Sequence, residues 1–262
     1  MLLLVATALA QDFSETDKEL DTTEASESHL SGELGASLTT GNTDFWTVQS
    51  TLAGSHRFES NKVGIVAGTL WGRAVLDADE DGTLSALEIA AGRADNARKV
   101  YGDLRYDRYL GARKNSLYAL GGALHDPFSG YDLRTHEQLG YSRLLLDSEA
   151  TELVAELGID YAQEDYVDGV EPNSANVIAG RAMLGFTHAL NENLGVANNL
   201  EVYENLRDFE DARVLNTASL NVALSDHLAL KVSHQLTWDN VPVESFRKLD
   251  QTAMMTVVAS VL

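Results

Sequence analysis

Hydrophobic and polar residues alternate along most of the chain from residue 33 to the end. The clearest stretch covers residues 228–238, where one face carries hydrophobic side chains and the other polar ones: Leu228, Leu230, Val232, Leu236 and Trp238 against Lys231, Ser233, Gln235 and Thr237. A period of two predicts β-strands with one apolar and one polar face. The pattern therefore predicts an all-β protein.

The connections between these strands alternate in length. Five short polar turns are expected at residues 59–62, 111–115, 146–149, 191–193 and 225–227. Six other loops, several of them longer, lie between the turns, at residues 41–44, 76–94, 125–132, 164–176, 208–213 and 239–248. An even number of strands with short turns on one side and longer loops on the other is typical of bacterial outer-membrane barrels.

We therefore expect a transmembrane, antiparallel, up-and-down β-barrel of about 12 strands over residues 33–262. Closure pairs every backbone N–H and C=O group inside the protein, which lipid requires. A large soluble β-sandwich or soluble barrel would also alternate. Only 3 prolines, an apolar N-terminus and alternation up to Leu262 favour the membrane barrel.

The N-terminal residues differ from the rest of the chain. Residues 1–10 are apolar and end in Ala8-Leu9-Ala10, which predicts a signal peptide, although the usual preceding positive charges are missing and the start is compatible with truncation. Residues 11–32 are rich in Asp, Glu, Ser and Thr, which predicts a disordered acidic extension in the periplasm.

Composition excludes several classes of function. The chain has 40 acidic and 19 basic residues, a formal charge of −21, so nucleic acid is not an expected partner. With no cysteine, it has neither disulfides nor a thiolate zinc site.

Several segments resemble a known family when they are taken in order: residues 34–44 (LGASLTTGNTD), 104–110, 126–134, 228–234, 238–242 and 248–250. The chain from about residue 33 onward is similar to the YdiY-like family of salt-induced outer-membrane proteins, a domain of unknown function. The resemblance implies an outer-membrane location, no established activity and no transferable catalytic residues. The family commonly ends in Phe, whereas this chain ends in Leu262, which weakens the expected signal for the barrel-assembly machinery.

Residues 77–88 match the pattern of an EF-hand calcium loop. Carboxylates stand at positions 1, 3, 5 and 12, with a glycine at position 6, and the predicted ligands are Asp77, Asp79, Asp81, Thr83, Ser85 and Glu88. The alternative is an acidic, solvated loop in a very acidic protein. We expect an insertion over residues 76–94 that binds Ca²⁺ on the cell surface, followed by at most one helix, near residues 86–95.

The polar strand faces predict charged groups inside the barrel: Asp103, Arg105 and Asp107; Arg134, His136 and Gln138; Glu152, Glu156 and Asp160; Asn199, Glu201, Asn205 and Arg207; and Arg181 and Lys231. They could line a water-filled path for ions or small solutes, or fill the lumen as paired charges. Aromatic residues near the strand ends predict two membrane belts: Trp46, Trp71 and Trp238 at the loops, and Tyr106, Tyr109, Tyr118 and Tyr141 at the turns.

We expect a structural or passive, porin-like channel in the outer membrane of a Gram-negative bacterium, not an enzyme. Its expected partners are outer-membrane lipids, lipopolysaccharide and the barrel-assembly machinery. The alternative is a phospholipase-like barrel that uses His188 or His234. That chemistry needs a serine beside the histidine, and Ser233 should point to the opposite face from His234.

Overall fold

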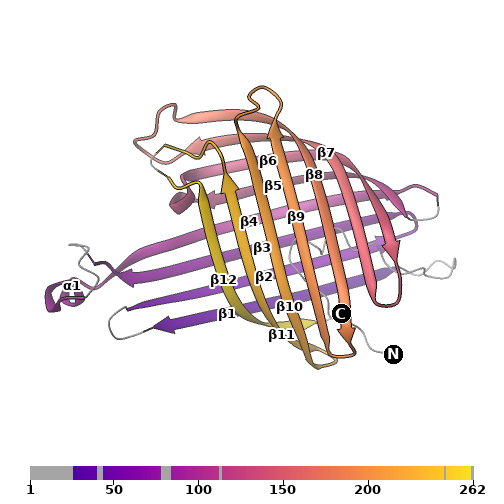
Figure 1. The fold of residues 1–262 in the computed structure, drawn as a ribbon, viewed down its shortest axis with the longest axis horizontal. Coiled ribbons are helices and arrows are strands. Elements are labelled where there is room, and N and C mark those ends of the chain that lie inside the picture. Colours follow the sequence, from indigo (N-terminus) through magenta and orange to yellow (C-terminus); the bar gives the residue numbers. More distant parts are fainter. Residues whose placement is uncertain (1–25, 40–43, 78–83, 112–113, 245, 261–262) are drawn as a thin grey trace.

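The computed structural model describes residues 26–39, 44–77, 84–111, 114–244 and 246–260. Within these residues, twelve antiparallel strands form one closed barrel in which each strand pairs with its neighbours in sequence and β1 pairs with β12 (Figure 1). The predicted fold class and strand number are confirmed.

The strands are β1 (Glu27–Thr39), β2 (Phe45–Phe58), β3 (Asn61–Val75), β4 (Arg93–Tyr109), β5 (Asn115–Asp126), β6 (Tyr131–Asp147), β7 (Thr151–Tyr166), β8 (Ser174–Asn191), β9 (Leu194–Asn205), β10 (Ala212–Ser225), β11 (Leu228–Asp239) and β12 (Leu249–Ser260). In the described parts of the loops lie two short helices, α1 (Ala86–Ala91) and the 3-10 helix η1 (Pro127–Ser129). The described residues contain no helix that is long and apolar enough to cross a membrane.

The barrel begins earlier than the sequence pattern predicts. β1 starts at Glu27 and pairs with β2 from Glu27↔Arg57 onward, so residues 27–32 belong to the barrel wall and not to an acidic extension. Polar inward residues in this segment, such as Ser31, hide the alternation, because the interior of this barrel is itself polar. The predicted signal peptide (1–10) and residues 11–25 of the predicted extension lie outside the described residues.

Burial is inverted relative to a water-soluble protein. In β7, Leu157 is 67% exposed, whereas its neighbour Glu156 is 1% exposed. The same alternation places most large hydrophobic side chains on the outside and most polar ones inside. This is the arrangement of a barrel whose outer face meets lipid.

The closing seam between β1 and β12 is short. The two strands share five paired positions, from Ser31↔Ser260 to Gly35↔Thr256, whereas every other neighbouring pair of strands shares ten or more among the described residues. At the last pair, a Cβ on Gly35 would lie 2.7 Å from Cγ2 of Thr256, so glycine permits the close approach there. Pairing stops at this point, although β1 continues to Thr39 and β12 extends back to Leu249.

The aromatic residues confirm only part of the two predicted belts. Trp46 and Trp71 pack edge to face at the loop ends of β2 and β3, with ring centroids 5.5 Å apart. Tyr106 and Tyr141 are exposed on the outer face near the turns. Tyr109 and Tyr118 are instead buried inside, 6% and 3% exposed, because they share strand faces with inward polar residues.

Candidate functional site: the barrel lumen

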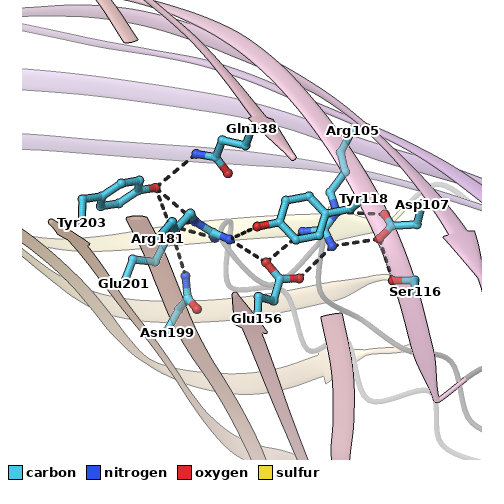
Figure 2. A network of polar contacts seen from close by, with 10 residues as sticks. All are labelled: Arg105, Asp107, Ser116, Tyr118, Gln138, Glu156, Arg181, Asn199, Glu201 and Tyr203. Carbon is cyan, nitrogen blue, oxygen red and sulfur yellow. Dashed lines mark hydrogen bonds and ion pairs between the residues drawn. The ribbon is translucent and has the colours of Figure 1, made fainter. Parts of the chain in front are cut away.

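A buried carboxylate inside the lumen lies between two guanidinium groups. Glu156 of β7 receives hydrogen bonds from Arg105 of β4 (Nη2 to Oε1, 2.7 Å) and from Arg181 of β8 (Nη1 to Oε2, 2.7 Å) (Figure 2). The exposed fractions of these side chains are 0%, 3% and 7% for Glu156, Arg105 and Arg181. β5 and β6 lie between β4 and β7 in the sheet, so the Arg105–Glu156 pair joins strands that are not neighbours.

Arg105 is held by two further side chains, Asp107 and Tyr118. It donates two hydrogen bonds to Asp107, both 2.8 Å, in the bidentate geometry that favours arginine over lysine. The hydroxyl of Ser116 donates to the same carboxylate over 3.1 Å. The guanidinium lies 4.2 Å from the ring centroid of Tyr118, a cation–π contact inside the barrel.

Arg181 extends the network to β9. Its Nε donates to Glu201 over 2.9 Å, and its Nη1 donates to the hydroxyl of Tyr118 over 2.9 Å. The hydroxyl of Tyr203 donates to Glu201 over 2.7 Å and accepts from Gln138 over 3.3 Å. We call the ten residues drawn in Figure 2 the lumen network: Arg105, Asp107, Ser116, Tyr118, Gln138, Glu156, Arg181, Asn199, Glu201 and Tyr203, from the six strands β4 to β9.

A second charge cluster fills the lumen nearer the loops. Glu164 of β7 is 1% exposed and pairs with Arg213 of β10 and with Arg134 of β6, the latter over 3.1 Å. Arg213 also pairs with Asp239 of β11 over 3.1 Å. The cluster therefore links β6 and β7 to β10 and β11, two strand pairs that are separated by β8 and β9 in the sheet.

Two smaller groups, among others, lie inside the described part of the barrel. Lys231 of β11 donates to Glu33 of β1 over 2.8 Å, across the inner side of the seam strand β12. Near the turns, Leu144, Val154 and Met183 form a buried apolar cluster. The described interior thus contains several groups of paired charges and one apolar cluster.

The loop between β11 and β12 crosses the mouth of the barrel. Val243 in this loop is 8% exposed and lies against Gly130, where a Cβ would come within 2.8 Å of the Val243 Cβ. Gly130 follows η1 between β5 and β6, which lie opposite β11 and β12 in the twelve-strand order. We call residues 240–248 the strap.

The structure brings together most of the predicted lumen residues and separates one. Asp103 pairs with His136 over 3.2 Å, as the face assignment allowed. Arg207, which was expected beside Glu201, lies beyond the end of β9 and is exposed, so that prediction was wrong. The tyrosines at 118 and 203 were missed as lumen residues, although their positions on the polar strand faces could have identified them.

The predicted calcium loop is only partly described. Asp79, Asp81 and Thr83 lie outside the described residues, and Asp77 follows the end of β3. Ser85 is the N-cap of α1: its backbone N–H donates to Glu88 over 2.8 Å, and its hydroxyl accepts from the Glu88 N–H over 3.3 Å. The helix begins at Ala86 as expected but ends at Ala91, because β4 already begins at Arg93. Figure 1 shows α1 beyond the loop ends of β3 and β4, away from the barrel wall.

The two histidines of the phospholipase alternative lie on the outer face. His188 shares a hydrogen bond of 2.8 Å with Thr151, its cross-strand partner. His234 shares one of 3.2 Å with Gln251. Neither partner is a serine, the residue type that the alternative requires.

A closed antiparallel barrel with an apolar outer face and a polar, ion-paired interior defines the class of outer-membrane-type β-barrels. Residues 32–261 match the family described as "Protein of unknown function, DUF481". The chain belongs to this family.

Two known proteins place the chain further. It is 25% identical over 179 residues to the uncharacterized protein YdiY of Escherichia coli (strain K12), an alignment that covers 68% of this chain and 63% of YdiY. Its fold is similar to that of the NanC porin, with a TM-score of 0.51 and 10% sequence identity over 90% of this chain and 99% of NanC. At this identity the likeness supports the fold alone.

Proposed function

We propose that this protein is a porin-like barrel of the bacterial outer membrane whose lumen is closed by paired charges in the state described. The observation that carries the proposal is Glu156, fully buried inside the barrel between Arg105 and Arg181. A water-filled pore would leave such side chains accessible. Passage of ions or small solutes therefore requires this network to rearrange.

The ends of the barrel support an orientation in the membrane. The short turns face the periplasm, and the longer loops, with α1 and the strap, face the outside, as is usual for bacterial outer-membrane barrels. The outer face contacts lipid, and lipopolysaccharide surrounds the loop end. Insertion in this orientation depends on the barrel-assembly machinery.

Conductance in planar lipid bilayers tests the closed lumen. The wild-type protein should give no steady conductance steps, whereas an Arg105→Ala/Arg181→Ala variant should give discrete steps. Removing both guanidiniums leaves carboxylates on the path, so the opened lumen should prefer cations in a KCl gradient. An Arg73→Ala variant is the matched control, because Arg73 pairs with Asp95 in a half-exposed position away from the network.

Two results would contradict this proposal. Steady wild-type steps of porin size would mean that the lumen is open. A double variant that is folded, as judged by its migration in unheated gels, yet silent would mean that other groups close the barrel.

We further propose that the loop over residues 76–94 binds Ca²⁺ and is stiffened by it, with lipopolysaccharide phosphates as additional ligands of the bound ion. The support is the sequence spacing together with Ser85 and Glu88, which are positioned as the N-cap and third residue of α1. Protease cleavage within this loop should slow when Ca²⁺ replaces a chelator. A Glu88→Gln variant should lose this protection, and equal cleavage of the wild type in both conditions would refute binding.

A further inference from the structure

Among the residues that the structure describes, one buried carboxylate of the barrel has no hydrogen-bond or ion-pair partner. Asp160 of β7 is 1% exposed, and neither of its oxygens has a hydrogen-bond partner among the described residues. The other six buried carboxylates each have a Lys or Arg partner at 2.5 to 3.9 Å: Glu33, Asp107, Asp126, Glu156, Glu164 and Asp211. Asp160 is thus an exception in an interior that otherwise pairs its charges.

A second unpartnered acceptor lies beside it. Gln138 of β6 is the cross-strand partner of Asp160, so their Cβ atoms are about 4.5–5.5 Å apart on the same face. The amide of Gln138 donates through Nε2 to Tyr203, which leaves Oε1 buried without a partner. On the other side, the partner in β8 is Ala179, whose methyl group offers no donor. Three acceptor oxygens at two paired positions of one strand face therefore have no donor among the described residues.

Rearranging the protein's own groups does not resolve the mismatch. Turning the Gln138 amide would give Asp160 a donor but would place Oε1 against the Tyr203 hydroxyl, whose proton is held by Glu201 at 2.7 Å. Protonating Asp160 would satisfy Gln138 Oε1 and still leave one carboxylate oxygen buried without a donor. A buried, unpaired charge is strongly unfavourable, and a positively charged occupant would compensate the charge of Asp160 directly.

We propose that Asp160 and Gln138 bind a monovalent alkali cation, Na⁺ or K⁺, inside the lumen. Carboxylate and amide oxygens are the ligands that hard cations take. The site contributes a single negative charge, which one monovalent ion neutralises without leaving an excess positive charge in the interior. This site goes beyond the proposed function, because it places a bound ion inside the barrel. Such an ion would be present even when the lumen conducts nothing.

Thermal unfolding of the full chain in detergent tests the site. The unfolding midpoint of the wild type should rise with Na⁺ or K⁺ and saturate, relative to N-methyl-D-glucamine chloride at equal ionic strength. All buffers contain a calcium chelator, so the loop over residues 76–94 does not contribute. An Asp160→Asn variant should lose the ion-specific shift completely. An Asp103→Asn variant should keep it, because Asp103 is also an inward carboxylate but pairs with His136.

A Gln138→Glu variant separates cation binding from the alternatives. A second carboxylate should lower the cation concentration at half-maximal shift about tenfold, through stronger attraction of the ion. If Gln138 instead donates to Asp160, this variant should be destabilised at every cation concentration. The proposal is overturned if the wild type responds equally to alkali and organic cations, if Asp160→Asn keeps the alkali-specific shift, or if stability follows pH alone. Should Asp160→Asn fail to fold, the wild type and Gln138→Glu still decide between these outcomes.

Discussion

The two sides of the barrel fill the interior in different ways. The wall from β4 to β9 contributes long charged and aromatic side chains that contact each other over several strands. The opposite wall contributes many short buried side chains, among them Ser31, Thr51, Ser219, Asn221, Ser233 and Thr256. Its long charged side chains include Lys231, which pairs with Glu33, and Arg213, which joins the cluster around Glu164. Arg57 and Lys62 are also buried there. The lumen network therefore belongs to one wall, whereas the Glu164 cluster joins both walls.

The largest expected effect is on the charged wall. A Glu156→Ala variant leaves Arg105 and Arg181 without their shared acceptor in a buried position, which should lower the free energy of unfolding by about 3–5 kcal/mol. Urea unfolding in detergent measures this difference. The control is Asp95→Ala, which breaks a half-exposed pair and should change stability by about 0–1 kcal/mol. Similar losses for the two variants would mean that the network does not hold the wall together.

On the opposite wall, the buried Lys231–Glu33 ion pair should be replaceable. Lys231→Met alone removes the cation next to buried Glu33 and should be destabilising by about 3 kcal/mol. Combining it with Glu33→Leu should recover most of this loss, because a buried pair can often be exchanged for apolar groups of similar volume. The same unfolding experiment gives both values. A double variant as unstable as Lys231→Met would contradict the comparison.

The strap should respond to a smaller change. A Gly130→Ala substitution adds a methyl group within 2.8 Å of Val243 and requires a side chain at φ +91°. It should cost about 1–2 kcal/mol and expose residues 240–248 to protease. Gly169→Ala is a matched control, because Gly169 has φ +92° and nothing within 4 Å of the added Cβ. Equal protease sensitivity in the two variants would show that the strap does not rest on Gly130.

The smallest effect on stability is expected from cross-links at the seam. A Leu34→Cys/Val257→Cys pair should form a disulfide, because these residues are paired. Ala36→Cys/Met255→Cys, two positions further along the same register, should not, since pairing has ended at Gly35. Ala36→Cys/Val48→Cys on the other side of β1 is the positive control. Efficient cross-linking of Ala36→Cys/Met255→Cys on a non-reducing gel would mean that the seam is longer.

The sequence predicts the wall of this barrel better than its contents. Alternation identifies strands because successive residues of a strand point to opposite faces, as exposed Leu157 and buried Glu156 do. The alternation does not show which inward side chains contact each other. Arg105 and Glu156 could therefore be predicted to point inward, but not to pair with each other, because two strands lie between theirs in the sheet. The start of β1 was missed because an inward serine or glutamate looks like an ordinary surface residue. The Val243–Gly130 contact depends on how a loop crosses the mouth, for which the sequence has no periodic signal.

The short seam also bears on how the barrel is made. Its five pairs join residues 31–35 to residues 256–260, which are nearly the full length of the chain apart. Every other pairing can form between consecutive strands as the hairpins appear, whereas this one must wait for the final strand. Until then the sheet has two open edges that could pair with another chain. Formation of the five-pair seam is therefore the folding step that covers these edges. If this step is slow, the open edges have the most time to pair wrongly with another chain.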